Sequence, residues 1–294
     1  MKRLVAVTTL LAALATACAE TGAQPIGPAP SDEPVGSPSP SVEPTPPTPT
    51  PTETPTPDRF VTYEVWFSYD GMLFLTHRTE SFVPAVGSLS LESLFEGPTR
   101  AERNAEVGSS IVPGTTLLGL TISEGLATVN LDDTFVSEET PAIAVGSLAQ
   151  VVYTLTQFDS VEGVRFQVNG SPLRNFGGYE LGGPQRRVDF LDQLPAILVT
   201  SPTIGERVDD PIRIAGTADV FEAVVSISIY DQAGRVIASS FTMATCGTGC
   251  RGTYETEVRY DVGTTQPGTV RVYEVSAMDG SSINVVDIPV TLTA

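Results

Sequence analysis

The three cysteines are the residues of this chain whose spacing points most directly to chemistry. Cys246 and Cys250 enclose the sequence CGTGC, whereas Cys18 stands alone at the end of an apolar N-terminal run. Zinc needs four ligands, and the only histidine, His77, lies in a distant part of the chain. A redox pair more usually has C-x-x-C spacing. We therefore predict a disulfide between Cys246 and Cys250, worth about 2 kcal/mol by the loop-entropy relation, which leaves Cys18 as the odd thiol.

The other reactive side chains form no catalytic pattern. A Ser-His-Asp or Cys-His arrangement would have to use His77, and no G-x-S-x-G sequence accompanies it. The acidic pairs Asp132-Asp133 and Glu138-Glu139 lack the spacing of a calcium-binding loop and read as solvated loop residues. No glycine-rich phosphate loop is present either. We predict a protein without catalytic residues, metal or cofactor.

The surroundings of Cys18 predict where the protein resides. Lys2 and Arg3 precede an uncharged, mostly apolar run over residues 4–14, which is too short to span a membrane and is typical of a signal peptide. Residues 1–17 resemble a bacterial lipoprotein signal, although Ala15 stands where leucine is usual. This resemblance implies that Cys18 carries a lipid. Ordinary A-x-A cleavage, which would release the protein, is the alternative.

Residues 18–58 are predicted to be a tether between that anchor and the folded body. The run PTPPTPTPTETPTP at 44–57 offers no apolar side chains to bury, and its prolines have no amide donor. An extended polyproline-like segment of this length would reach roughly 100 Å. The segment is therefore expected to be disordered and to hold the folded body away from the membrane.

The charge balance excludes two classes of partner. The chain has 16 Lys+Arg against 35 Asp+Glu, a net charge of −19. Such an acidic protein offers no basic surface to a phosphate backbone, so we expect no nucleic-acid binding. It also has no polybasic segment for anionic lipids. Membrane attachment would therefore depend on the lipid at Cys18.

Residues 59–170 show interleaved strand and helix patterns. Large apolar or aromatic side chains stand at every second position of residues 61–69, and the Asp70-Gly71 turn signal follows. This pattern predicts a hairpin with residues 72–78. Helical spacing follows at 89–98 and 147–158. Further strands are expected at 115–122, 126–132 and 163–168. One sheet with two helices on a face is the simplest packing of these elements, so the domain is predicted to be α+β.

Within this region the chain resembles a known family. LESLFEGP, IVPGTTLLGLTISEGLATVNLDDTF and LAQVVYTLTQFDSVEGVRFQVNG are similar to the GerMN domain of sporulation and germination proteins. That domain also occurs in bacterial envelope lipoproteins. The resemblance implies a fold and carries no catalytic residue.

After a connector at 171–194, residues 195–294 are predicted to be all-β. Seven short strand-like runs without a helix pattern are typical of a two-sheet antiparallel sandwich. ILVTSPTIGERVDDPIRIAGTADVFEA, VYEVSAMDGS and IPVTL resemble the immunoglobulin-like domain of bacterial spore germination proteins. In that family this domain commonly follows a GerMN domain.

The resulting expectation is a non-catalytic protein, exported and lipid-anchored to the outer face of the cell membrane. Its two domains would bind other envelope proteins or the cell wall. Two alternatives stay open. A wall-polymer hydrolase would need a cleft lined with two carboxylates or a histidine-centred site. A carbohydrate-binding module would need clustered aromatic side chains, and Trp66 is the only tryptophan.

Overall fold

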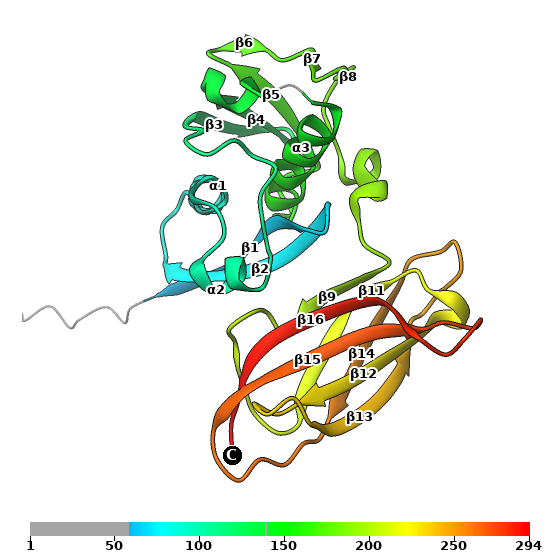
Figure 1. The fold of residues 1–294 in the computed structure, drawn as a ribbon. Helices are drawn as coiled ribbons and strands as arrows, with labels where there is room; N and C mark the ends of the chain where they lie inside the picture. The colour runs from blue at the N-terminus through cyan, green and yellow to red at the C-terminus, as the bar shows by residue number, and fades with distance from the viewer. Residues whose placement is uncertain (1–58, 139) are drawn as a thin grey trace, which may run out of the picture. The chain divides into compact units, whose positions relative to one another are not determined.

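A computed structural model describes residues 59–138 and 140–294 (Figure 1). The predicted signal peptide at 1–17, the predicted lipidation site Cys18, the tether at 18–58 and Glu139 lie outside the described residues. None of the helices in the described ranges is both long and apolar enough to cross a membrane.

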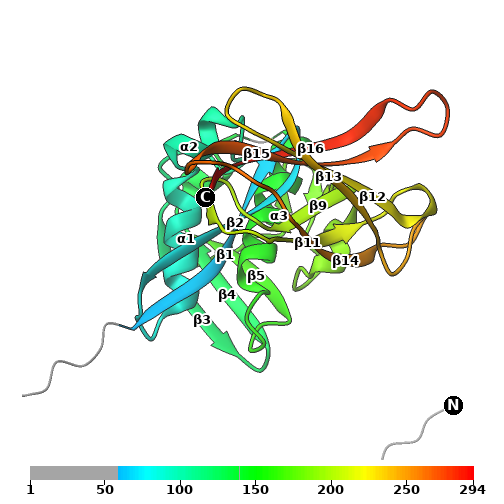
Figure 2. The ribbon, with the colours of Figure 1, turned by 90° about the horizontal axis from the view of Figure 1, so that it is seen from below.

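The first domain begins with the predicted hairpin. β1 (Phe60–Tyr69) and β2 (Met72–Ser81) pair antiparallel along their whole length. Asp70 and Gly71 both have positive φ, 49° and 76°, which fits a two-residue hairpin turn. Tyr63, Val65 and Phe67 are buried on the face that the alternation predicts. Figures 1 and 2 show this long, twisted ribbon in blue.

A second, four-stranded sheet completes the domain. Its order is β3-β4-β5-β6, from β3 (Leu117–Ser123), β4 (Leu126–Leu131), β5 (Gly163–Val168) and β6 (Ser171–Pro172). β4 and β5 are parallel, and the connection between them contains the 3-10 helix η1 (Asp133–Val136) and α3 (Pro141–Leu155). Two further helices, α1 (Val86–Glu96) and α2 (Arg100–Asn104), lie between β2 and β3 in the chain.

The expectation of a single sheet in this domain was wrong, because β1 and β2 form a two-stranded sheet separate from β3–β6, and β1 adds only an isolated bridge from Ser68 to Gly108. The edge of β1 is instead hydrogen-bonded by polar side chains of α3 and the residues after it. Thr154 Oγ1 accepts from Trp66 N (3.1 Å), and Gln150 Nε2 donates to the Trp66 carbonyl (3.0 Å). Gln157 accepts from Glu64 N (2.7 Å) and donates to Glu64 O (2.8 Å). Helix side chains thus satisfy the backbone groups that a neighbouring strand would satisfy.

Residues 171–194, predicted to be a connector, hold short elements that pack on the first domain. β6 extends the four-stranded sheet, and β7 (Asn175–Phe176) and β8 (Tyr179–Glu180) form a small hairpin. The 3-10 segment η2 (Arg187–Gln193) follows. Phe176 and Phe190 are 1% exposed, so this segment contributes to the hydrophobic core.

The second domain is the predicted two-sheet sandwich. One sheet has the order β10-β16-β15-β12-β13 and the other β14-β11-β9. The strands of these two sheets are β9 (Ile197–Ser201), β10 (Arg207–Val208), β11 (Ile212–Ala218), β12 (Val224–Tyr230), β13 (Val236–Met243), β14 (Gly252–Val258), β15 (Gln266–Val275) and β16 (Ser282–Leu292).

Alternation along the central strands of this sandwich builds its core. Val225, Ile227 and Ile229 of β12 are fully buried, and β15 adds Val270 and Val272. The β15–β16 hairpin projects from the sandwich in both views (Figures 1 and 2). The two-residue strand β10, which pairs parallel to β16, has too short a pattern to be read from the sequence.

Candidate functional site

The cysteine pair lies in the loop between β13 and β14. A disulfide joins Cys246 and Cys250, whose Cα atoms are 5.6 Å apart. The loop packs against the 3-10 turn η3 (Phe221–Ala223): Thr248 N donates to the carbonyl of Val220 (3.0 Å), next to that turn. A β-carbon on Gly247 would approach the backbone of η3 to 2.5 Å. The surroundings are those of a packed structural turn.

His77 has no catalytic neighbourhood. It lies in β2 opposite Glu64 of β1 and is partly exposed. Its imidazole makes no hydrogen bond within the described parts of the chain, and no nucleophile is hydrogen-bonded to it. The arrangement gives no support to acid–base chemistry at this residue.

The residue after His77 belongs to a buried ion pair. Arg78 donates to both carboxylate oxygens of Glu102, at 2.7 and 2.8 Å, and Glu102 is 2% exposed. Thr76 Oγ1 and the backbone N–H of Thr99 also donate to this carboxylate, at 2.5 and 2.7 Å. Burial by itself would raise the pKa of Glu102, but these hydrogen bonds and the charge of Arg78 outweigh it and lower the pKa. All the acceptor sites are used internally, so the pair is structural.

The described acidic loop residues Asp132, Asp133 and Glu138 belong to no cluster with metal-ligand geometry. Over residues 59–138 and 140–294, no three His, Cys, Asp or Glu side chains lie close enough to hold a metal ion. Asp132 instead accepts from the Thr116 N–H and from Thr134 Oγ1, both at 3.1 Å, and so organises its own turn. Glu138 is exposed, and its neighbour Glu139 is not described.

The single tryptophan is part of an internal cluster. Trp66 is 3% exposed and its ring lies 4.8 Å from that of Tyr153. The guanidinium of Arg187, from η2, lies over both rings, at 5.5 and 4.7 Å. Arg187 also donates to Thr156 Oγ1 (2.8 Å) and to the Tyr153 carbonyl (3.1 Å). Trp66 is thus not accessible as a stacking surface for a sugar.

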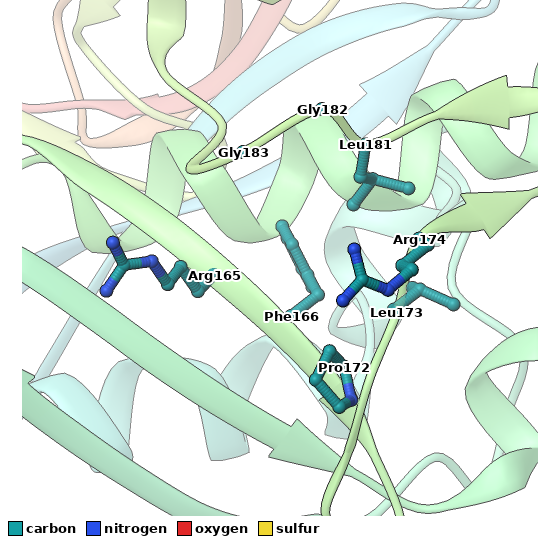
Figure 3. Close-up of a pocket in the computed structure, with 8 residues that line it drawn as sticks. All are labelled: Arg165, Phe166, Pro172, Leu173, Arg174, Leu181, Gly182 and Gly183. Atoms are coloured by element: carbon teal, nitrogen blue, oxygen red, sulfur yellow. The ribbon is translucent and has the colours of Figure 1, made fainter. Parts of the chain in front are cut away.

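A cavity of about 220 Å³ lies beside β5 (Figure 3). The chain returns to the outer edge of β5 twice. Leu173 N donates to the Phe166 carbonyl (3.0 Å), and Gln185 exchanges two hydrogen bonds with Val164 (2.7 and 2.8 Å). Between these points the chain arches away as the β7–β8 hairpin and leaves an opening. The cavity is lined by Arg165, Phe166, Pro172, Leu173, Arg174, Leu181, Gly182 and Gly183.

The floor of this cavity is apolar and well supported. Phe166 is 4% exposed and Leu181 is 9% exposed. The Phe166 ring stacks on Phe135 with centroids 6.2 Å apart, and Phe135 in turn contacts Phe176 at 5.3 Å. This packing fixes the Phe166 ring, so the apolar part of the cavity is preformed.

The rim of the cavity carries positive charge without a compensating acid. Figure 3 shows the Arg174 guanidinium close to the Phe166 ring, whereas the Arg165 side chain extends away from the ring and from Arg174. No aspartate or glutamate lines the cavity. Neither Arg165 nor Arg174 forms an ion pair or a side-chain hydrogen bond with any residue that the structure describes. This cavity is the candidate functional site, which sequence analysis missed.

Comparisons with known proteins identify both domains. A family model described as sporulation and spore germination matches residues 75–174. A second, described as the immunoglobulin-like domain of bacterial spore germination, matches residues 196–281. No curated protein matches the chain.

Two solved structures of the sporulation protein GerM from Bacillus subtilis are also similar. The tandem GerMN domains are 16% identical, with a TM-score of 0.41, over 80% of this chain. This chain spans 61% of that structure's length. The first GerMN domain alone is 20% identical, with a TM-score of 0.37, over 44% of this chain and 99% of that structure.

Proposed function

We propose that this chain is a non-catalytic protein of the cell envelope, because a sporulation and spore germination domain is followed by an immunoglobulin-like domain of bacterial spore germination in the family matches. The two domains act as interaction modules for other envelope proteins or for the cell wall. A lipid on Cys18 anchors them to the outer face of the membrane, and residues 18–58 serve as the tether.

The order of the two domains is the observation that carries this proposal. The chemistry of the described residues supports it, because the candidate site offers no group that could act as an acid, a base or a nucleophile. A second surface depression, near the end of β12, does contain the carboxylates Asp231 and Asp287. Asp231 forms an ion pair with Arg235 (N–O distance 2.6 Å), and Asp287 forms one with Arg271 (2.7 Å). Neither carboxylate is therefore free for glycoside hydrolysis.

An exposed apolar strand also supports an interaction role. Phe241 and Met243 of β13 are 68% and 62% exposed, and β13 is the last strand of its sheet. Exposed apolar groups on a sheet edge are a common feature of surfaces that bind another protein. The eight residues of β13 include no charged side chain, although the chain as a whole has a net charge of −19.

The anchor is tested by membrane fractionation of Cys18→Ser in a strain that lacks the wild-type gene. The variant is expected in the soluble envelope or medium fraction. The matched control is the Cys246→Ser, Cys250→Ser double variant, which loses two cysteines but keeps Cys18, and should remain with the membrane. Unchanged membrane retention of Cys18→Ser would overturn the anchor.

The non-catalytic role is tested by complementation in the same strain. His77→Gln is expected to restore the wild-type phenotype, since His77 has no partner that would make it catalytic. Deletion of residues 196–294 is expected to abolish function. Circular dichroism confirms that each variant is folded. Loss of function in a folded His77→Gln protein would favour an enzyme centred on that residue instead.

A further inference from the structure

The arginine-rimmed cavity beside β5 has the opposite electrostatic character to the chain that contains it. Acidic residues outnumber basic ones by 35 to 16, yet two arginines and no acid line this opening. Arginine presents a planar set of donors that matches a carboxylate or a phosphate. Since the Arg174 guanidinium beside the Phe166 ring is not used by a carboxylate in the described part of the chain, it can pair with an anion from outside.

The backbone conformation does not require glycine at either of the two rim positions. Gly182 and Gly183 do not have the positive φ that favours glycine, and a β-carbon on either would meet nothing within 4 Å. Neither N–H donates to another described residue, although their neighbours Leu181 and Gln185 both do. Residues with side chains would fit at these positions, but they would narrow the opening. The two glycines therefore keep the opening wide, and their N–H groups have no acceptor among the described residues.

The volume and the apolar lining of the cavity restrict the chemical class of ligand that it can bind. With a volume of about 220 Å³, the opening has room for a small terminal group. Phe166 and Leu181 give that group an apolar surface to rest on. Inorganic phosphate would make no apolar contact with Phe166 and Leu181. A terminal amino acid with a small apolar side chain could pair its carboxylate with the arginine and pack its side chain on these two residues.

We propose that this cavity binds the C-terminal carboxylate of a peptide whose last residue has a small apolar side chain. Arg174 pairs with the carboxylate, and the side chain rests on Phe166 and Leu181. This binding site is an inference beyond the proposed function. Only the source of the peptide rests on the proposed location in the cell envelope. That source is either a protein C-terminus, with L residues, or a wall peptide that ends in D residues.

The binding test uses the full chain with Cys18→Ser, which prevents lipidation, labelled with ¹⁵N. The probes are N-acetyl-L-Ala-L-Ala, N-acetyl-D-Ala-D-Ala, the C-terminal amide of each, and inorganic phosphate. We expect saturable shifts of the Gly182 and Gly183 amide resonances with at least one free carboxylate and none with the amides. A preference for the L or the D peptide identifies the source.

Amino-acid substitutions distinguish specific binding in this cavity from weak, non-specific binding to surface arginines. Arg174→Gln should weaken carboxylate binding by tenfold or more, in line with the loss of a charged hydrogen bond. Gly183→Val should also weaken it, because its side chain obstructs the rim. The matched control is Arg207→Gln, an exposed arginine of β10 that forms no ion pair with the described residues, and it should bind like the parent chain.

Three outcomes would overturn the proposal: equal binding of carboxylate and amide, equal loss from Arg174→Gln and Arg207→Gln, or phosphate binding as tight as that of either peptide. Phosphate binding as tight as that of a peptide would identify an anion site to which contacts with Phe166 and Leu181 contribute nothing. If the binding test gives a negative result, the outcomes of the membrane fractionation and complementation tests are unaffected. A failure of this inference can therefore be distinguished from a failure of the proposed envelope function.

Discussion

Replacing Glu102 by Gln tests how much the first domain depends on its buried ion pair. The substitution keeps the size of the side chain and removes the negative charge that Arg78 faces at 2.7 Å. Removing one partner of a buried pair costs about 3–5 kcal/mol, because the other charge stays buried without compensation. The Arg78 side chain is 16% exposed and water can relieve part of that cost. We therefore expect a loss near the lower limit, about 3 kcal/mol.

The single tryptophan makes this loss measurable in one domain. Trp66 lies in β1 of the first domain and is 3% exposed, so its fluorescence will change when that domain unfolds. Guanidinium chloride titration followed at Trp66 gives the free energy of unfolding. The matched control is Glu92→Gln, at an exposed position of α1, which should change that free energy by no more than about 0.5 kcal/mol.

The dependence on pH gives a second, independent check. The folded pKa of Glu102 is lowered from its ordinary value of 4.5, so the ionised carboxylate stabilises the fold above that value. This contribution is lost as the pH falls through the lowered, folded-state pKa. The difference between wild type and Glu102→Gln should therefore be largest near neutral pH and shrink in acid. A difference below about 0.5 kcal/mol, or one that does not change with pH, would refute the reasoning.

The remaining predictions concern polar pairing, the disulfide, the tether and the exposed strand. Gln150→Leu should lower the free energy of unfolding by about 2–4 kcal/mol in the same titration, because it leaves the buried Trp66 carbonyl and the partly buried Ser110 N–H unpaired. Cys246 and Cys250 should be found joined by peptide mapping without reductant, and their double serine variant should lose about 2 kcal/mol by calorimetry. Deleting residues 30–57 should leave the melting temperature unchanged, whereas a drop of many degrees would mean that the tether packs on a domain. Phe241→Ser should leave the stability within about 0.5 kcal/mol and reduce cross-linking to envelope proteins in intact cells.

The strands and hairpins of both domains could be predicted because their signals are local. Alternation along β1 and the Asp70-Gly71 turn lie within a dozen residues, and the hairpin follows from them. The start of α3 is equally local but was placed six residues late, at Ser147. The Thr140-Pro141 pair marks the true start, since the Thr140 side chain caps the helix and Pro141 occupies its first turn.

The division into two sheets depends on contacts that no local pattern reveals. Gln150 and Thr154 lie within an otherwise apolar helix, and both are fully buried. From sequence alone they look like polar interruptions of the core-facing surface. In the structure they hydrogen-bond the carbonyl and N–H of Trp66 in β1, 84 and 88 residues earlier, at distances of 3.0 and 3.1 Å. A strand whose edge is satisfied by a helix needs no strand partner there, and this explains why β1 and β2 stand apart.

The candidate site was out of reach of sequence analysis for the same reason. Arg165, Arg174 and Gly182 are spread over a strand, the base of a hairpin and a loop, with no recurrent spacing that marks a binding motif. They come together because the chain leaves the edge of β5 after Leu173 and rejoins it at Gln185. One sequence signal was present: two adjacent glycines that neither form the hairpin turn nor end a helix. Glycines without a conformational role can mark a place where a ligand approaches the backbone, and in this chain they line the same cavity as Arg174, which no acid lines.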